Sequence, residues 1–307
     1  SDVEITQNLQ AVNDCDESGA GDNIGSCHSL ADNFINSIDQ SNTADVADDF
    51  VQNNLVAISQ DYQSTNDCDE EGEGDNDGTS QSCLFQVGNF IGPVSQTNGA
   101  TGTEVTDISQ NNDISANQLV TADNDCDQTG AGDNLAVCQA GGFNSMDLIT
   151  QANSATGDFF SDISQDNDIA FSQVIDQSND CNESTLTGSG NNEARCNDNP
   201  ENKFHTVDQE NIATAFDDST IDQDNNIVVS QNSVADNTCD GTGTHTAECD
   251  NVNSQNVISS ITQDNLATGS DAAVILQSNN ADIDQNMVLL NDCDEVDLGS
   301  NDASCSN

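Results

Sequence analysis

Residues 275–285 read Ile-Leu-Gln-Ser-Asn-Asn-Ala-Asp-Ile-Asp-Gln, and Cys293 follows the last glutamine by eight positions. Every second residue of this stretch is apolar or carries a side-chain amide, namely Ile275, Gln277, Asn279, Ala281, Ile283 and Gln285. Because side chains alternate between the two faces of a β-strand, these residues would share one face and the mostly polar residues between them the other. The stretch therefore predicts a β-strand.

The same frame occurs four more times, beginning at residues 50, 108, 163 and 221. In every copy two glutamines lie eight positions apart, and a cysteine follows the second glutamine by eight. A second segment of the same period, apolar-x-Gln-x-Asn-x-Ala, begins at residues 38, 94, 149, 207 and 261. Disordered chains do not keep such a register, so the pattern indicates a repeat protein.

We predict an all-β fold, a β-solenoid or β-arcade of about five repeats of 53–58 residues with disulfide-closed loops. The whole chain, 1–307, is expected to be one repeat array. Its parts are a partial repeat 1–14, five repeats at 15–67, 68–125, 126–180, 181–238 and 239–292, and a terminal partial repeat 293–307. Because the array ends out of phase, we expect copies to join head-to-tail and stack through open sheet edges.

The predicted inward faces carry many Gln and Asn residues, whose burial without partners costs about 1–3 kcal/mol per group. Stacking identical amides in register, about 4.8 Å apart, removes this cost because each amide donates to one neighbour and accepts from the other. We predict amide ladders at Gln40, Asn42, Gln52, Asn54, Gln60, Gln96, Asn98, Gln110, Asn112, Gln118, Gln151, Asn153, Gln165, Asn167, Gln173, Gln209, Asn211, Gln223, Asn225, Gln231, Gln263, Asn265, Gln277, Asn279 and Gln285.

The chain is extremely acidic, with 56 Asp and Glu residues against only Arg195 and Lys203, for a net charge of −54. Nucleic acid and anionic membrane surfaces would repel it. No apolar stretch is long enough for membrane insertion. No catalytic motif or recurrent His–Ser or His–Cys arrangement distinguishes any residue, so we predict that the protein is not an enzyme and needs no organic cofactor.

Twelve cysteines occur in regular pairs, which is typical of exported proteins with a disulfide framework. The candidates are Cys15, Cys27, Cys68, Cys83, Cys126, Cys138, Cys181, Cys196, Cys239, Cys249, Cys293 and Cys305. Pairing within each loop is the simplest connectivity, and bridges between units or subunits stay open. Metal-thiolate binding is disfavoured because His28, His205 and His245 do not recur at equivalent positions.

Three cysteine loops begin with alternating acidic residues followed by glycine, which resembles the start of a calcium-binding loop. The candidate ligands are Asp14, Asp16, Asp22, Asp67, Asp69, Asp75, Asp125, Asp127 and Asp133. No Glu occupies the twelfth position, so the alternative is a solvated acidic face with loosely held counterions. In both cases Ca²⁺ or other cations are expected to affect packing.

The half-frame Asn279-x-Ala281-x-Ile283-x-Gln285 resembles the curlin repeat of bacterial functional amyloid. It differs from curlin in the spacing from Gln to Asn, which is two residues here and five in the curlin repeat. Curlin subunits also lack these cysteine pairs. Curlin-like strands together with acidity, cysteine pairs and exported character resemble the major sheath proteins of filamentous methanogenic archaea. That resemblance implies amyloid-like subunits forming hoops that stack into a rigid tube around the cells.

We therefore predict a structural protein that binds itself and assembles into an extracellular, cell-surface sheath or tube. The first alternative is a curli-like biofilm or adhesive fibre. The second is a soluble Ca²⁺-binding or ice-binding solenoid; ice binding would favour an outward array of Thr, whereas the outward positions are mainly Ser, Asp and Asn.

Overall fold

The computed structural model describes residues 1–20, 26–72, 76–77, 83–103, 106–131, 133–185, 191–241, 244–270, 272–293 and 302–306. These residues form strands and turns, and no helix among them is long and apolar enough to cross a membrane. Every strand pair that they form is parallel and joins equivalent residues of successive repeats. The predicted all-β repeat fold is thereby confirmed.

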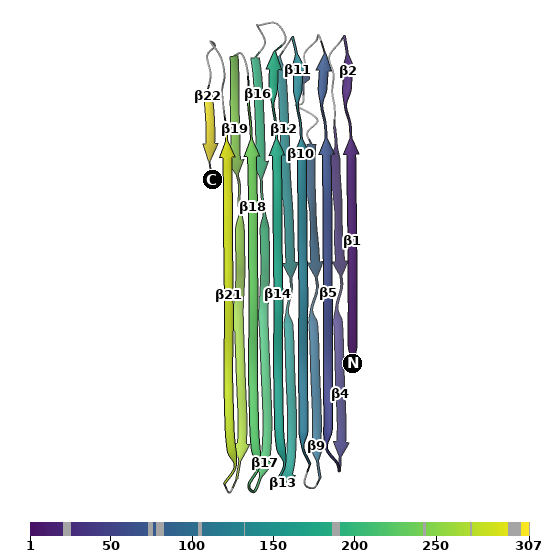
Figure 1. The fold of residues 1–307 in the computed structure, drawn as a ribbon, viewed down its shortest axis with the longest axis vertical. Helices are drawn as coiled ribbons and strands as arrows, with labels where there is room; N and C mark the ends of the chain where they lie inside the picture. The colour runs from purple at the N-terminus through teal and green to yellow at the C-terminus, as the bar shows by residue number, and fades with distance from the viewer. Residues whose placement is uncertain are drawn as a thin grey trace.

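The first layer is a six-stranded sheet of long strands that follow one another in chain order (Figure 1). The strands are β1 (Asp2–Asp14), β5 (Phe50–Asp67), β10 (Ile108–Asp125), β14 (Asp162–Asp180), β18 (Thr220–Thr238) and β21 (Val274–Asp292). Gln110, for example, lies opposite Gln52 on one side and Gln165 on the other. Residues that lie one repeat apart in the sequence therefore lie on adjacent strands of the sheet.

The second layer runs back along the first and consists of two segments per repeat (Figure 1). Nearer the cysteines lie β3 (His28–Ile35), β8 (Cys83–Ile91), β12 (Asn134–Met146), β16 (Asn191–Asp198), β19 (Thr244–Asn251) and β22 (Asp302–Ser306). Farther along lie β4 (Ile38–Val46), β9 (Val94–Gly102), β13 (Ile149–Phe159), β17 (Glu201–Phe216) and β20 (Gln255–Gly269).

The cysteine loops, which link the two layers, add a small third sheet at one end of the molecule (Figure 1). It contains β2 (Glu17–Gly19), β6 (Glu70–Gly72), β11 (Gln128–Gly130) and β15 (Glu183–Thr185), and the short β7 (Asn76–Asp77) pairs with β12. One long strand, its cysteine loop and its return strands make up one rung, and the rungs stack in sequence order.

The core lies between the two layers and consists of columns of similar side chains. In β14 buried and partly exposed residues alternate along nearly the whole strand, as the period of two predicts. One column contains Ile114, Ile169 and Ile227, each at most 1% exposed, and Val207 lies in the same cluster from the second layer. No single rung could bury this surface, because a rung is one strand thick.

Val228 and Val229 give a matched test of this arrangement, because they are adjacent in β18 but lie on opposite faces. Val229 is 1% exposed and Val228 is 42% exposed. Val229→Ala should lower the free energy of unfolding by about 2 kcal/mol through lost burial and a residual cavity, and Val228→Ala by well under half of that. Denaturant unfolding of the two variants with disulfides intact measures the difference, and equal losses would contradict the assigned faces.

Candidate functional site

Columns of glutamine side chains run the length of the stack. Gln110 Nε2 donates to Gln52 Oε1 at 2.9 Å, and Gln165 donates to Gln110 at 2.8 Å. The second N–H of each amide crosses to the other layer, as when Gln118 Nε2 donates to the Ser145 carbonyl oxygen at 3.1 Å. The same amides therefore join the rungs to one another and the two layers to each other.

Asparagine columns in the two layers interlock. Asn98 Nδ2 donates to Asn153 Oδ1 in its own layer and to Asn112 Oδ1 in the facing layer, both at 3.0 Å. Asn112 in turn donates to Asn167 and to Asn153 at 3.0 Å. Every amide that the sequence singled out hydrogen-bonds to its equivalent in an adjacent rung, so these amides are paired within the protein.

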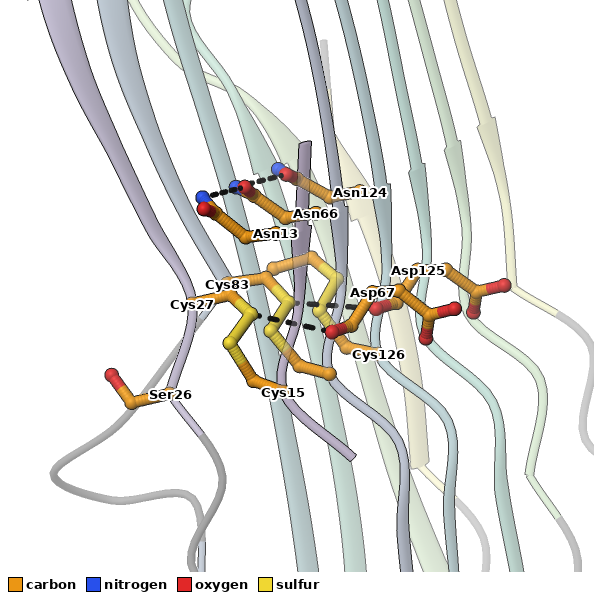
Figure 2. Close-up of a disulfide and its surroundings, with 12 residues drawn as sticks. Asn13, Cys15, Ser26, Cys27, Asn66, Asp67, Cys83, Asn124, Asp125 and Cys126 are labelled. Atoms are coloured by element: carbon orange, nitrogen blue, oxygen red, sulfur yellow. Dashed lines mark hydrogen bonds between the residues drawn. A yellow bond between two sulfur atoms is a disulfide. The ribbon is translucent and has the colours of Figure 1, made fainter. Parts of the chain in front are cut away.

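Two further asparagine columns were missed by sequence reasoning. One follows the long strands just before the cysteines, where Asn13, Asn66, Asn124, Asn179, Asn237 and Asn291 are linked at 2.8–3.0 Å. Figure 2 shows Asn13, Asn66 and Asn124 of this column. The other contains Asn33, Asn89, Asn144, Asn202 and Asn256 in the return strands. The signal was present, because each Asn of the first column lies two positions before a cysteine.

The cysteines form a double column of sulfur atoms beside these asparagines (Figure 2). Five loops are closed internally, by disulfides Cys15–Cys27, Cys68–Cys83, Cys126–Cys138, Cys239–Cys249 and Cys293–Cys305. Sulfur atoms of successive rungs approach closely, so the column is continuous. Several disulfides indicate an oxidising, extracellular environment.

The fourth loop differs from the predicted set of disulfides. Cys181 and Cys196 are buried thiols, although they occupy the same register as the other pairs. Each thiol has a carbonyl oxygen nearby, Arg195 O at 3.6 Å for Cys181 and Thr238 O at 3.2 Å for Cys196, and equivalent contacts occur in the bridged loops. Burial raises the pKa of both thiols, which keeps them protonated and unreactive.

At least one acidic residue lies beside the first cysteine of each loop, and these residues also stack in columns. Asp14, Asp67, Asp125 and Asp180 lie opposite one another in register. The next column accepts backbone N–H groups from the following rung: Asp127 N donates to Asp69 Oδ1 at 3.1 Å, and Asn182 N donates to Asp127 Oδ1 at 3.2 Å. These carboxylates therefore have a structural role between rungs.

The predicted calcium ligands are brought together across rungs rather than within one loop. Carboxylate oxygens of Asp16, Asp67 and Asp69 lie within 4.8 Å of one another. A groove of about 550 Å³ follows this edge and is lined by Asp16, Glu17, Ser18, Asp69, Glu70, Glu71, Asp127 and Thr129. Asp133 is exposed, and Asp22 and Asp75 lie outside the described residues. A hard cation could bind between adjacent carboxylates here.

Burial and mutual repulsion shift the titration of this edge. Partial burial, followed by the neighbouring carboxylates of Asp127 and Asp69, raises the pKa of Asp125 to about 7. Burial is also the main cause that raises the pKa of Asp67, Asp69, Asp127 and Asp180. Protons or cations must therefore offset the repulsion that stacking creates.

The two ends of the stack leave their terminal strands with one neighbour each among the described residues. β1 pairs with β5, and β21 pairs with β18. At the β21 end the residues of the core frame are exposed, with Ile275 at 42% and Ile283 at 46%. Both ends thus present apolar side chains, amides and a row of unpaired backbone groups.

No family model, no curated protein and no solved structure matches this chain.

The acidic columns predict that stability falls as pH rises. A carboxyl group whose pKa is higher in the folded than in the unfolded chain stabilises the fold when protonated, and this contribution is lost as pH passes through the folded-state value. Thermal unfolding should therefore occur at a lower temperature at about pH 8 than at about pH 5. Added CaCl₂ should recover more of the loss than NaCl of equal ionic strength.

Asp125→Asn tests the origin of this pH dependence. It removes one of the titrating groups at the centre of the column, so the variant should lose less stability between the two pH values. The matched control is Asp39→Asn at an exposed residue of β4, and it should leave the pH dependence of unfolding unchanged. A midpoint that rises with pH would contradict the assigned repulsion.

Proposed function

We propose that the protein is a structural subunit that assembles with copies of itself into an amyloid-like extracellular layer, a sheath or tube around cells. The observation that carries the proposal is the continuous column of in-register backbone and amide hydrogen bonds, which is open at both ends of the described stack. Nothing in the repeating geometry limits the number of rungs, so a second copy can continue it.

The energetics of the terminal strands support assembly. A long, flat, apolar edge strand is a template for pairing with another chain. Around Ile275 and Ile283 the exposed face of β21 is the same face that is buried in the interior rungs. Adding one more rung would bury these side chains and pair their backbone groups, as occurs at each interior position.

Disulfides and surface charge suit such a layer. The five internal bridges close all but the fourth of the cysteine loops at one end of the stack and resist unfolding outside the cell, where reduction is rare. The net charge of −54 keeps the outer faces hydrated and limits side-to-side aggregation. Cations held along the acidic edge would then control how closely assembled stacks approach.

A soluble cation-binding solenoid is the second candidate, and the acidic groove lined by Asp16, Asp69 and Asp127 favours it. This function needs only one copy of the chain and predicts saturable Ca²⁺ binding by a monomer. A curli-like fibre would use the same edge pairing as a sheath but would give thin filaments instead of closed hoops.

Electron microscopy of the native material, in hot detergent with and without a reductant, distinguishes the candidates. We expect hoops or tubes that survive detergent and fall apart after reduction. Purified protein should show the same assemblies, with the strand repeat of about 4.8 Å that is typical of a cross-β structure. A protein that stays monomeric in sedimentation at all concentrations, with and without Ca²⁺, would refute the proposal.

Adjacent residues of β21 supply a variant and its control. Ile283→Lys places a charge on the face that the next rung would bury, so assembly should be lost. Asp284→Lys makes the same side chain on the outward face, and it should assemble as well as the wild type. Equal behaviour of the two variants would argue against edge pairing through β21.

A further inference from the structure

All glutamine columns have the same direction. In every pair the later rung donates and the earlier rung accepts: Gln60 Nε2 donates to Gln7 Oε1 at 2.7 Å, and Gln285 Nε2 donates to Gln231 Oε1 at 2.6 Å. The glutamine columns of the second layer share this direction, as when Gln263 donates to Gln209 at 2.9 Å. The stack is therefore polar along its axis, as a helix is along its own.

The asparagine columns run the opposite way. Asn13 Nδ2 donates to Asn66 Oδ1 at 2.8 Å, and Asn54 Nδ2 donates to Asn112 Oδ1 at 3.0 Å, so the earlier rung is the donor. Each rung thus presents glutamine donors and asparagine acceptors on one side, and the reverse on the other. The two ends of the stack are chemically different but complementary.

Gln7 and Gln285 show what this polarity leaves at the ends. Gln7 uses its oxygen for Gln60 and one N–H for the Phe34 carbonyl oxygen at 3.2 Å, which leaves a second N–H. Gln285 uses both N–H groups, toward Gln231 and the Asn256 carbonyl oxygen, which leaves its oxygen as an acceptor. One end therefore offers a donor, and the other end offers an acceptor, at the same position of the same column.

We infer that a second copy joins with its β1 on β21 in a single register, with Gln7 donating to Gln285 Oε1. This inference rests on the proposed self-assembly and specifies its direction. The register places Ile5 over Ile283 and Asn13 over Asn291, which continues these columns of the first layer.

The same polarity excludes the two symmetric joints. Pairing β21 with β21 of another copy in the register centred on Gln285 would oppose two Gln285 oxygens, and pairing β1 with β1 in the register centred on Gln7 would oppose two Gln7 donors. Each would also require antiparallel strands, which lose the in-register columns on which every interior rung depends. Growth should therefore be head-to-tail only.

Replacing each of the two glutamines by glutamate tests the direction. In Gln7→Glu the new carboxylate still accepts from Gln60 within its own chain, but it loses the bond to the Phe34 carbonyl oxygen and can no longer donate to the next copy. In Gln285→Glu the new carboxylate loses the bonds to Gln231 and Asn256 but still accepts at the joint. Both variants add one charge at the same joint, so they are matched for electrostatic cost.

We expect Gln7→Glu to raise the critical concentration for assembly at least tenfold at about pH 7.5, and Gln285→Glu to raise it about threefold or less. At about pH 4 the protonated carboxyl group of the Gln7→Glu variant can donate again, so this variant should recover relative to the wild type at that pH. If Gln7→Glu unfolds at a lower temperature than the wild type, Gln7→Leu repeats the test without charge.

The outcomes separate the inference from the proposed function. Wild-type protein that assembles while the two variants behave alike, or while Gln285→Glu is the more impaired, overturns the stated direction and leaves self-assembly in place. Wild-type protein that does not assemble overturns both. Assembly is followed by sedimentation and electron microscopy, and the folding of each variant by its thermal unfolding.

Discussion

The hydrogen bond between identical amides of successive rungs is the interaction on which the rest of this structure depends. A face that mixes Ile with Gln and Asn is a poor core for an isolated sheet, because unpaired amides cost more than the apolar residues beside them gain. In register, the buried amides of the glutamine and asparagine columns find their partners in the neighbouring rungs and in the facing layer. Burial of Ile, Val and Phe then becomes net favourable, and the register cannot slip without breaking every column at once.

Register also determines where charge accumulates. Parallel stacking brings the same residue type together in every rung, so Asp lies over Asp just as Gln lies over Gln. Stacked amides gain hydrogen bonds, whereas stacked carboxylates repel one another. Together with burial, this repulsion raises the pKa of Asp125. Some of the acidic residues offset the repulsion by accepting backbone N–H groups of the next rung. The remaining repulsion makes the acidic edge responsive to protons and cations, while the disulfides hold the adjacent loops closed.

Much of the fold could be predicted from the sequence because periodicity of two and constant spacing are local properties. The Gln52–Gln60 frame and the cysteine eight positions later identify strand, face and repeat without any knowledge of contacts. The thiols of Cys181 and Cys196 could not be predicted, because these cysteines occupy the same positions of the repeat as the bridged pairs. The Asn13–Asn66 column was missed because asparagine beside Asp and Cys looks like an ordinary loop residue. That the calcium-like carboxylates meet across rungs follows from stacking, which spacing within one loop does not reveal.

The exchange of side-chain amide protons with solvent deuterium, followed by NMR, tests the central claim most directly. Asn112 and Gln165 are at most 1% exposed, and each is hydrogen-bonded to its equivalents in the neighbouring rungs. Their side-chain N–H groups should therefore exchange only through global unfolding. The amide of Asn117, which is exposed on the outer face of β10, should exchange at once. Exchange of Asn112 and Gln165 as fast as Asn117 in the folded protein would contradict the amide columns as the basis of the stack.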